Sequence, residues 1–540
     1  MKRLLFIIIG LVALGVIFAM APAKKRTARK KVEDKRVYLV HSDRLHYDQY
    51  RNGDAQVLNG RVHFRHQGAD LYCDSAHFYQ KSNSFEAFGH VRMVQGDTLS
   101  LTSDYAYYDG NDQLAQARYN VVLRHRKSTL YTDSLDYDRM YNFGNFFEGG
   151  KLVDGNSVLT SDWGEYHTDT KQAMFYYDVR LKDNKLYLTT DSLFYDTQTS
   201  RAHIVGPSNI TSGSSHIYSE DGFYNTKTEQ SELFGRSVIS DQGRTLIGDS
   251  VYHNASDGTN YAYWNVVYND TVNKNMMTGD YCEYNDSTGY AMATNKAVTI
   301  DYSQQDSLFM HADTFKIFTF NIRTDSVYRK IHAYNKVRAY RTDVQAVCDS
   351  LVYNTQDSCM TMYKDPIIWN NAQQLFGEVV KVYMRDSTID HAHVIGQAFS
   401  AEQLHDTIHY NQISSKEMKA FFKKGEVREF QAIDNVMVDY FYTDEEDSVV
   451  TLMNYLETSW LRMFLKDRKM EKIWTNKASG VYYPLNQIPA DKNPLPGFAW
   501  FDYVRPVNKD DIFNWRPKKA GSELKATLRR EPPKKTIHHE

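Results

Sequence analysis

The chain has 540 residues, of which 42% are hydrophobic and 24% charged, and its formal net charge is -3. This balance is typical of a folded protein. It excludes extensive disorder and binding of nucleic acid that is driven mainly by net positive charge. The 40 tyrosines favour β-structure, because aromatic rings pack well on a half-buried pleated surface. Most of the 11 prolines lie at or after Pro484, so the preceding chain can form nearly uninterrupted strand ladders.

The N-terminus carries an export signal. Lys2 and Arg3 precede an apolar run over residues 4–20, and small residues follow as far as Ala23. A run of this length also just spans a bilayer as a retained anchor. The sequence therefore predicts either a cleaved signal peptide or a membrane anchor over residues 1–23, then a basic linker over 24–36 and an exported body.

A short pattern recurs through most of the body: an apolar residue, an acid three positions later, a small or aliphatic residue two further on, and an aromatic residue two beyond that. Leu71, Asp74, Ala76 and Phe78 form one copy. The acids are Asp43, Asp74, Asp104, Asp133, Asp162, Asp191, Glu220, Asp249, Asp280, Asp313 and Asp349. As far as Asp280 their spacing is 29–31 residues, which indicates a repeat architecture.

Each period holds two strands. A Gly, Asn or Asp recurs half a period after the acid, as at Gly89, and turn signals occur twice per period, as at 95–97 and 109–112. The predicted fold is an all-β, elongated, open β-jellyroll of about fourteen hairpin repeats of about 30 residues. If the strands divide between two facing sheets at ~4.8 Å each, the trough is about 65 Å long.

The repeats define the domain boundaries. Regular copies occupy residues 37–365, and divergent copies occupy 366–479, including a hairpin over 449–474 that also has the pattern of an amphipathic helix. A coil rich in proline and aromatic residues follows over 480–517 and is apolar enough to pack on the body. Residues 518–540 form a basic tail that we expect to be disordered.

The repeated acid marks a change of strand face. The apolar residues three before it and two after it have opposite parity, so both face the core only if the strand bends or bulges at the acid. We interpret the ten acids from Asp74 to Asp349 as structural corner residues that bond local backbone amides. The alternative, a ladder of cation sites, is less favoured, because an identical placement in every repeat is typical of architecture.

Signals for catalysis or metal binding are poor. Cys73, Cys282, Cys348 and Cys359 have no metal-ligand spacing. His391 and His393 share a strand face, but a metal site needs three or more ligands. The sequence also has no glycine-rich phosphate loop and no GxSxG motif. We therefore expect no catalytic residue, no metal and no cofactor, and a protein that is not an enzyme.

The export signal and the repeats resemble the OstA-like family of lipopolysaccharide-transport jellyrolls, first named for organic solvent tolerance. The resemblance spans about residues 37–485 and is carried by residues 56–62 with 69–76 and by residues 476–485. It implies a periplasmic protein that is either anchored in the inner membrane or associated with the outer membrane. Such a protein binds the acyl chains of lipopolysaccharide (lipid A) between two sheets and carries it across the periplasm for outer-membrane assembly.

The resemblance also implies a lipid-binding ladder and partners. The aromatic residue four positions after nine of the acids is the candidate lining, because tyrosine has an apolar ring and a polar tip. The ladder consists of Tyr47, Phe78, Tyr108, Tyr137, Tyr166, Tyr195, Tyr224, Tyr284 and Tyr353. Expected partners are lipopolysaccharide, other jellyroll components of the transport bridge through edge-strand stacking, and the membrane through an uncleaved N-terminal segment, with no nucleic acid.

The sequence leaves two other hypotheses open. One is a right-handed parallel β-helix, as a surface adhesin or a polysaccharide-active enzyme, although two turn signals per period favour hairpins over a three-strand coil. The other is a structural envelope scaffold, which the sequence leaves open.

Overall fold

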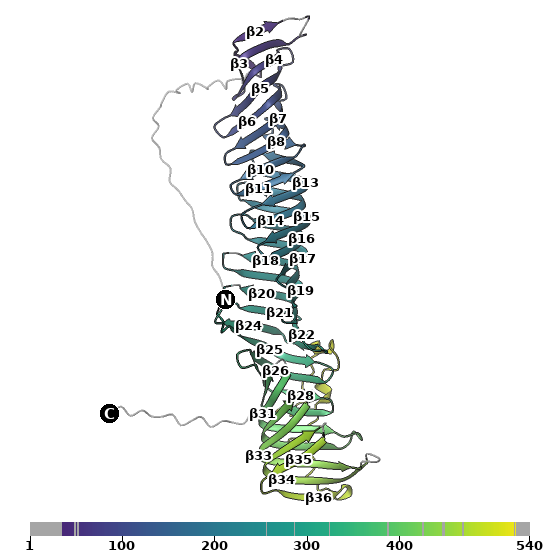
Figure 1. Ribbon diagram of the computed structural model, residues 1–540. Helices are drawn as coiled ribbons and strands as arrows, with labels where there is room; N and C mark the ends of the chain where they lie inside the picture. The colour runs from purple at the N-terminus through teal and green to yellow at the C-terminus, as the bar shows by residue number, and fades with distance from the viewer. Residues whose placement is uncertain are drawn as a thin grey trace, which may run out of the picture.

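The protein is an elongated column of β-strands, seen in a computed structural model that describes residues 35–522 and 524 apart from 48–49, 51–52, 255, 286, 323, 386–387, 424–425, 445–448 and 467–468. The column runs from β2 at one end to β36 at the other (Figure 1). The described residues form 36 strands and three short 3-10 segments. The predicted elongated all-β fold is confirmed, whereas the segment at residues 1–23 lies outside the described residues. In the described part, no helix is long and apolar enough to cross a membrane.

The strands follow one another along the column in chain order. The first twelve are β1 (Tyr38–His41), β2 (Arg44–Tyr47), β3 (Gln56–His66), β4 (Ala69–Tyr79), β5 (Ser84–Gln95), β6 (Leu99–Asp109), β7 (Leu114–His125), β8 (Ser128–Asp138), β9 (Phe143–Phe146), β10 (Gly150–Asp154), β11 (Ser157–Ser161) and β12 (Trp163–His167). The next twelve are β13 (Gln172–Lys182), β14 (Leu186–Asp196), β15 (Arg201–Ser212), β16 (Ser215–Asn225), β17 (Ser231–Asp241), β18 (Arg244–Asn254), β19 (Thr259–Asp270), β20 (Asn275–Asn285), β21 (Ala291–Thr294), β22 (Val298–Asp301), β23 (Leu308–His311) and β24 (Thr314–Phe320).

The C-terminal part completes the column. Its strands are β25 (Tyr328–Tyr340), β26 (Val344–Asn354), β27 (Cys359–Tyr363), β28 (Ile367–Asn370), β29 (Gln373–Phe376), β30 (Val379–Arg385), β31 (Thr388–Gln403), β32 (Tyr410–Lys423), β33 (Glu426–Thr443), β34 (Val450–Lys466), β35 (Lys469–Thr475) and β36 (Ser479–Pro484). The 3-10 segments are η1 (Leu485–Gln487), η2 (Asp502–Val504) and η3 (Asp511–Phe513). The stretch 449–474 is a hairpin of β34 and β35, as the sequence favoured.

Every long strand bends in its middle. Between β3 and β4 the pairing passes from Asn59 opposite Ser75 to Val62 opposite Cys73, so two residues of β3 face Asp74 at the bend. Eight pairs of short strands are single strands interrupted at this point, so the 36 strands correspond to 28 that cross the bend. The interrupted pairs are β1/β2, β9/β10, β11/β12, β21/β22, β23/β24, β27/β28, β29/β30 and β35/β36.

The bend divides one continuous sheet into two facing arms joined along a line that we call the spine. We expected the strands to be shared between two sheets, but each strand contributes one half to each arm. At ~4.8 Å per strand, 28 adjacent strands give a column on the order of 130 Å long, about twice the expected trough. The physical reason is the bulge at the acid, which bends a strand without ending it.

Left-handed backbone makes the bulge possible. Gly89 lies opposite Asp74 with φ at +73°, and a Cβ there would stand 2.6 Å from Asp74 Oδ2. Glycine avoids both the steric cost of a positive φ and this close approach. Gly60, beside Asp43 with φ at +79°, repeats the arrangement one period earlier.

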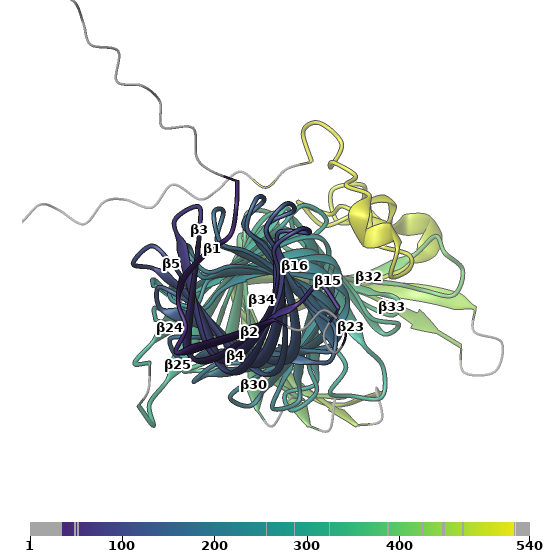
Figure 2. The ribbon, with the colours of Figure 1, turned by 90° about the horizontal axis from the view of Figure 1, so that it is seen from above.

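Hairpin turns lie along the free edges of the two arms. The first turn row follows β3, β5 and β7, at 67–68, 96–98 and 126–127, and continues in the same alternation along the column. The second turn row follows β4, β6 and β8, at 80–83, 110–113 and 139–142. We call the line where the two rows face each other the mouth. Viewed along the column, the strands wrap around a common axis (Figure 2).

The space between the arms is the main core. Leu71 and Ala76, which flank the acid with opposite parity, are 5% and 0% exposed, so both face the interior as the pattern predicted. One apolar cluster runs from Val37 to Val266 and a second from Ala293 to Leu461. The interior is therefore shared by many repeats, each of which buries its apolar residues only against its neighbours.

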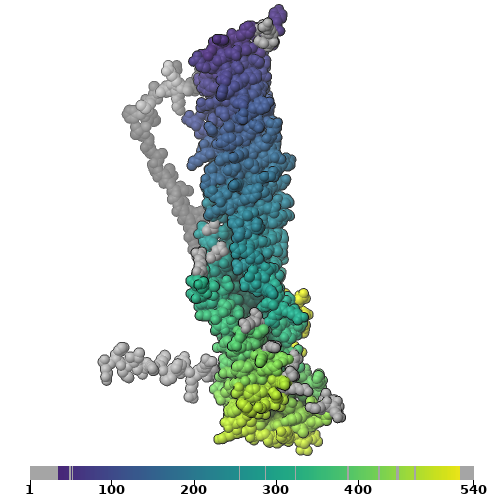
Figure 3. Space-filling view, in the orientation of Figure 1, coloured from purple at the N-terminus to yellow at the C-terminus, as the bar shows by residue number. Residues whose placement is uncertain are grey.

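The C-terminal segment packs on the outer face of the arm that ends at the first turn row. Leu495 and Phe501 join Trp369 and Phe376 in a third apolar cluster, and the backbone N–H of Phe501 donates to Gln374 Oε1 at 2.8 Å. This segment lies against the C-terminal half of the column (Figure 3). Strand β36 extends the sheet to Pro484, so the coil begins five residues later than the sequence boundary at 480.

Candidate functional site

The mouth is closed over the N-terminal part of the column by contacts between the two turn rows. The hydroxyl of Tyr108, near the second row, lies 2.7 Å from Nδ1 of His66, at the first row. Farther along, the Tyr166 hydroxyl lies 2.9 Å from Nδ1 of His125. The Tyr195 hydroxyl donates to Asp154 Oδ2 at 3.2 Å. Three ladder tyrosines therefore place their rings inside and their polar tips across the mouth.

Arg139 adds a charged bridge. It leaves the second turn row and is only 6% exposed. Its guanidinium donates to the Tyr108 hydroxyl at 2.6 Å, to Gln95 Oε1 at 3.1 Å and to the Gln67 carbonyl at 3.1 Å. Because Gln67 lies in the first row and Gln95 ends the strand that leads into it, one side chain connects both edges of the column.

An ion pair joins the two turn rows farther along the column. Lys185 in the first row lies 2.7 Å from Glu229 in the second row. Both side chains are substantially exposed, at 69% and 38%. We call strands β3–β15 the closed section, because their interior is filled and these contacts cover most of its mouth.

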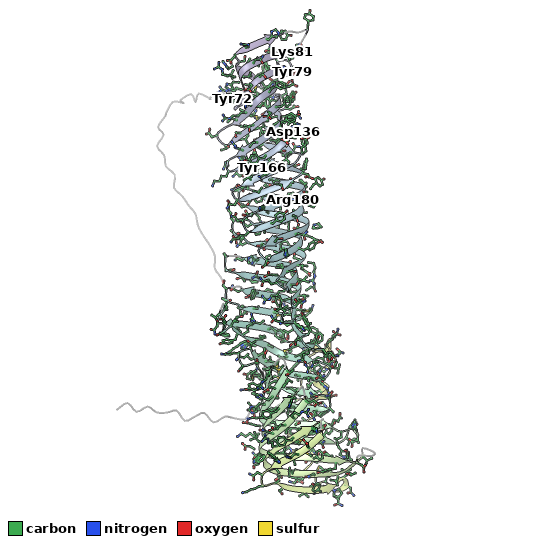
Figure 4. All side chains as sticks on the ribbon, in the orientation of Figure 1. Tyr72, Tyr79, Lys81, Asp136, Tyr166 and Arg180 are labelled. Carbon is green, nitrogen blue, oxygen red and sulfur yellow. The ribbon has the colours of Figure 1, made fainter. Side chains whose placement is uncertain are left out.

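The candidate ladder falls into three groups. Phe78, Tyr108, Tyr137, Tyr166 and Tyr195 are 1–6% exposed and fill the closed section. Tyr224 and Tyr353 are half-buried. Tyr47 on the edge strand β2 and Tyr284 on β20 are 51% and 46% exposed. Figure 4 labels Tyr166 among the strands of the closed section. The structure thus aligns these residues along one arm but does not give them one common environment.

The interior opens in strands β16–β20, which we call the open section. Seven inward apolar side chains there are only half-buried, whereas Leu233, Val251 and Val266 in the same strands stay almost fully buried, as their counterparts in the closed section do. These half-buried residues are Ile217, Tyr224, Ile239, Leu246, Tyr268, Met277 and Cys282. The two large apolar clusters meet in this part of the column, with Val266 ending the first and Ala293 beginning the second.

Residue size at the bend differs at one position. In the closed section the inward residue after the bulge is usually valine, as at Val62, Val121 and Val179. Serine takes that position at Ser208 and Ser237, and valine returns at Val266 within the open section. Ser219 and Ser237 bond each other across strands at 2.9 Å. Small side chains leave volume near the spine that valine would occupy.

The corner acids lie on the outer side of the spine. Asp74 is 62% exposed and bonds His90 at 2.7 Å, and Asp104 accepts from the Asn120 amide at 2.7 Å. Asp249 likewise accepts from Asn265. Their main partners are therefore side chains of the neighbouring bulge, and backbone bonds such as Asn120 N–H to Asp133 at 3.2 Å are the minority. This differs from the expected pattern, because the bulge turns its side chains toward the acid.

The partners of the corner acids differ in chemistry. The Ser350 hydroxyl and the Lys364 ammonium lower the pKa of Asp349, and Asn265 followed by Arg236 lowers that of Asp249. The remaining corner acids, Asp162, Asp191, Glu220, Asp280 and Asp313, occupy the same register along the spine. Across the described residues, no group of three His, Cys, Asp or Glu is placed to hold a metal ion.

The histidine and cysteine candidates are dispersed. His391 bonds Asp390 at 2.8 Å, whereas His393 bonds Glu417 at 3.0 Å. All four cysteines are free thiols, and burial raises the pKa of Cys73 and Cys282 to about 12. These thiols act as small interior residues.

Sequence reasoning missed the residues that close the mouth. Arg139, Lys185 and Glu229 lie in turns, where charged residues are common and a cross-column partner leaves no local pattern. It also missed the open section, although a partial signal existed: serine takes the place of valine after the bulge at Ser208 and Ser237.

The N-terminal part of the repeat region matches a known family. The family model, described as OstA-like protein, matches residues 34–191 and 177–238. This match confirms the resemblance inferred from the repeats, over the residues that it covers.

Among solved structures, the chain is similar to LptH from Pseudomonas aeruginosa, whose title describes the LptA-homologous periplasmic component of the conserved lipopolysaccharide transport device. The identity is 15% and the TM-score 0.14, and the similarity covers 26% of this chain and 82% of that one. No curated protein matches the chain.

Proposed function

We propose that this protein binds the acyl chains of lipopolysaccharide between its two arms and carries it across the periplasm for outer-membrane assembly. The observation that carries the proposal is the open section, where seven inward apolar residues are partly accessible beside a filled interior. The OstA-like match over residues 34–238 supports the same function. Burying one CH₂ contributes about 0.8 kcal/mol, so several acyl chains supply enough affinity without a specific polar site.

The open section is the proposed entry. Ile239, Leu246 and Tyr268 already face a partly accessible interior, so an acyl chain would meet apolar surface there without displacing a packed side chain. Movement into the closed section requires the cross-mouth contacts to separate. The bonds of Tyr108, Tyr166 and Tyr195 across the mouth are therefore proposed to open and re-form as lipid passes.

The ends of the column suit assembly with other jellyrolls. Strand β36 pairs with β34 on one side and exposes Val481 and Tyr482, at 44% and 61%. Strand β2, at the opposite end of the column, exposes Leu45 and Tyr47 (Figure 1). Unpaired strand edges with apolar side chains join partners by strand addition, so we place further transport components at these ends.

Site-specific photocrosslinking in living cells tests the proposal. Probes replacing Leu246 and Tyr268 should trap lipopolysaccharide, whereas a probe at the exposed turn residue Asn111 should not. Probes at Tyr108 and Tyr166 should trap it only while transport is active. No labelling at either interior set, or equal labelling at Asn111, would contradict the proposal and favour an envelope scaffold.

The parallel β-helix hypothesis is wrong, because every strand pairing in the described residues is antiparallel.

A further inference from the structure

A hollow lies in the mouth where the closed section meets the open one. Its volume is about 650 Å³. The first turn row contributes residues 125–128, 154–157 and 183–185, and the second row contributes 171, 197–198, 200, 226–227 and 229. Tyr166, Tyr195 and Tyr224 also line it. The hollow is therefore bounded by both edges of the column, and its tyrosines belong to the interior ladder.

Cations outnumber acids around this hollow. Five basic side chains line it, against three acids, Asp154, Asp183 and Glu229. The basic residues are Arg126, Lys127, Lys171, Lys185 and Lys227. Two of the acids are already engaged, since Asp154 accepts from Tyr195 and Glu229 pairs with Lys185.

Three of the five cations are available to a ligand. In the part of the chain that the structure describes, the side chains of Arg126, Lys127 and Lys227 have no ion-pair partner, and all three are exposed. Lys171 donates only to the neutral Gln198 amide, at 3.0 Å. Burial lowers the pKa of His125 between the two rows, and the charges of Arg126 and Lys171 lower it further. The floor of the hollow therefore lies in a positive field.

The Lys185–Glu229 pair crosses this hollow from one row to the other. An exposed ion pair contributes little to stability, about 0–1 kcal/mol. A multiply charged anion that reaches Lys185 would therefore replace Glu229 at low cost. Replacement would also release the last described contact across the mouth.

We propose that this hollow binds phosphate groups of an amphiphile whose acyl chains lie between the arms, and that bound phosphate takes Lys185 from Glu229 and frees the mouth. This inference rests on the proposed function, because it places the headgroup of the same ligand. The position fits: Tyr224 lines the hollow and also belongs to the open section, so a chain entering there leaves its headgroup beside Lys227. Phosphate suits the site because it accepts several charge-assisted hydrogen bonds from separate ammonium and guanidinium groups.

The test compares lipids that differ only in phosphate. The full-length protein is titrated with phosphorylated lipid A, with enzymatically dephosphorylated lipid A and with inorganic pyrophosphate. The site variant replaces Arg126, Lys127 and Lys227 by Gln. The control variant makes the same charge change at the exposed outer-face residues Arg92, Arg124 and Lys182.

The site variant should weaken binding of phosphorylated lipid A about tenfold and reduce its salt dependence, because ion contacts to phosphate are screened by salt. Its affinity for dephosphorylated lipid A should not change, and the control variant should alter neither. Pyrophosphate should bind the wild-type protein weakly and the site variant not at all, which distinguishes a headgroup held with its chains from free phosphate. Equal affinity of wild type and site variant for the phosphorylated lipid would overturn the inference.

Two outcomes separate this inference from the proposed function. If both lipids bind equally well and the site variant binds like wild type, acyl binding stands and the phosphate site is wrong. If neither lipid binds, the proposed function fails. In that case pyrophosphate binding that disappears in the site variant would still establish an anion site. If the wild-type protein does not bind pyrophosphate either, the anion site is also wrong.

The ion pair supplies a further readout. Glu229→Gln should tighten binding of phosphorylated lipid A, because Lys185 no longer has a competing carboxylate, whereas Lys185→Gln should weaken it. The exchange of both, Lys185→Glu with Glu229→Lys, keeps the pair and the net charge and should bind near the wild-type level. Tighter binding in Lys185→Gln would contradict the exchange of partners.

Discussion

The closed and open sections share one repeat and one backbone arrangement, yet their interiors differ. Leu188 and Leu246 both stand three residues before a corner acid, on β14 and β18. Leu188 is 1% exposed, whereas Leu246 is only half-buried. The bend therefore fixes where side chains point, whereas the burial of equivalent inward side chains differs along the column.

Contacts across the mouth reinforce this difference. In the closed section, His66, His125 and Asp154 meet tyrosine hydroxyls from the opposite row. The described contacts end at Lys185 and Glu229, beside the first strands of the open section. A filled interior and a bonded mouth thus occur together, as expected if packing draws the two turn rows within bonding distance.

The largest effect should come from the matched leucines. Leu188→Ala leaves a cavity in a filled interior and should cost about 2–5 kcal/mol, whereas Leu246→Ala removes a half-buried side chain and should cost about 1 kcal/mol or less. Local hydrogen exchange is the suitable measurement, because long repeat arrays need not unfold in two states. Equal losses at the two positions would mean that the sections do not differ in packing.

Removal of the buried bridge should be the next largest effect. Arg139→Met deletes three hydrogen bonds across the mouth and should destabilise the closed section by about 2 kcal/mol, since buried charge-assisted bonds are involved. Exchange protection should fall in both turn rows near 67–68 and 139–142. Arg124→Met, at an exposed outer position, should change stability by less than about 0.5 kcal/mol. Similar results for both variants would refute the bridge.

The C-terminal segment covers an apolar face on the outside of the column. Asp439 is 0% exposed beneath this segment, between Gln412 and Tyr455 in the sheet, and burial raises its pKa to about 7 although Lys492 acts against the shift. An unfolded aspartate loses its proton near pH 4, so stability falls as pH rises from about 4 to 7.

Docking of residues 485–513 should accordingly strengthen by about 2 kcal/mol when the pH is lowered from 7.5 to 5.5. Limited proteolysis of this segment across that range measures the effect. Asp439→Asn should remove the pH dependence, and persistence of the dependence in that variant would assign it to another group.

The smallest expected effect is a pH dependence of stability in the closed section, opposite in sign to that of Asp439. Burial, followed by the charges of Arg126 and Lys171, lowers the pKa of His125 below its usual value near 6.5. The contribution of neutral His125 to the stability of the folded state is complete above that pH. It is lost as the pH falls, because the unfolded chain then binds the proton more readily than the folded one. Exchange protection near Tyr166 should therefore decrease on acidification, and His125→Gln should respond less. An increase on acidification in the wild type would contradict this.

Much of the fold could be predicted from the pattern around each acid. Leu71 and Ala76 share the interior despite opposite parity, and this alone requires a bend at Asp74. The hairpin over 449–474 followed from turn placement. The expected column length was wrong, because the strands were divided between two sheets, and only the pairing shows that each bent strand belongs to both arms. The roles of Tyr108 and Tyr166 were incomplete, since their hydroxyl partners lie some 40 residues away in the chain.

By itself, the sequence determined the antiparallel repeat, the bends and the inward positions, because strand parity and turn chemistry are local properties of the chain. Only the tertiary structure decided that every strand serves both arms, that the mouth is bonded as far as Lys185 and Glu229, and that the interior opens over β16–β20. These features depend on how side-chain volumes from many repeats fill a shared space, and on which turns meet across it. Neither quantity is carried by any single repeat.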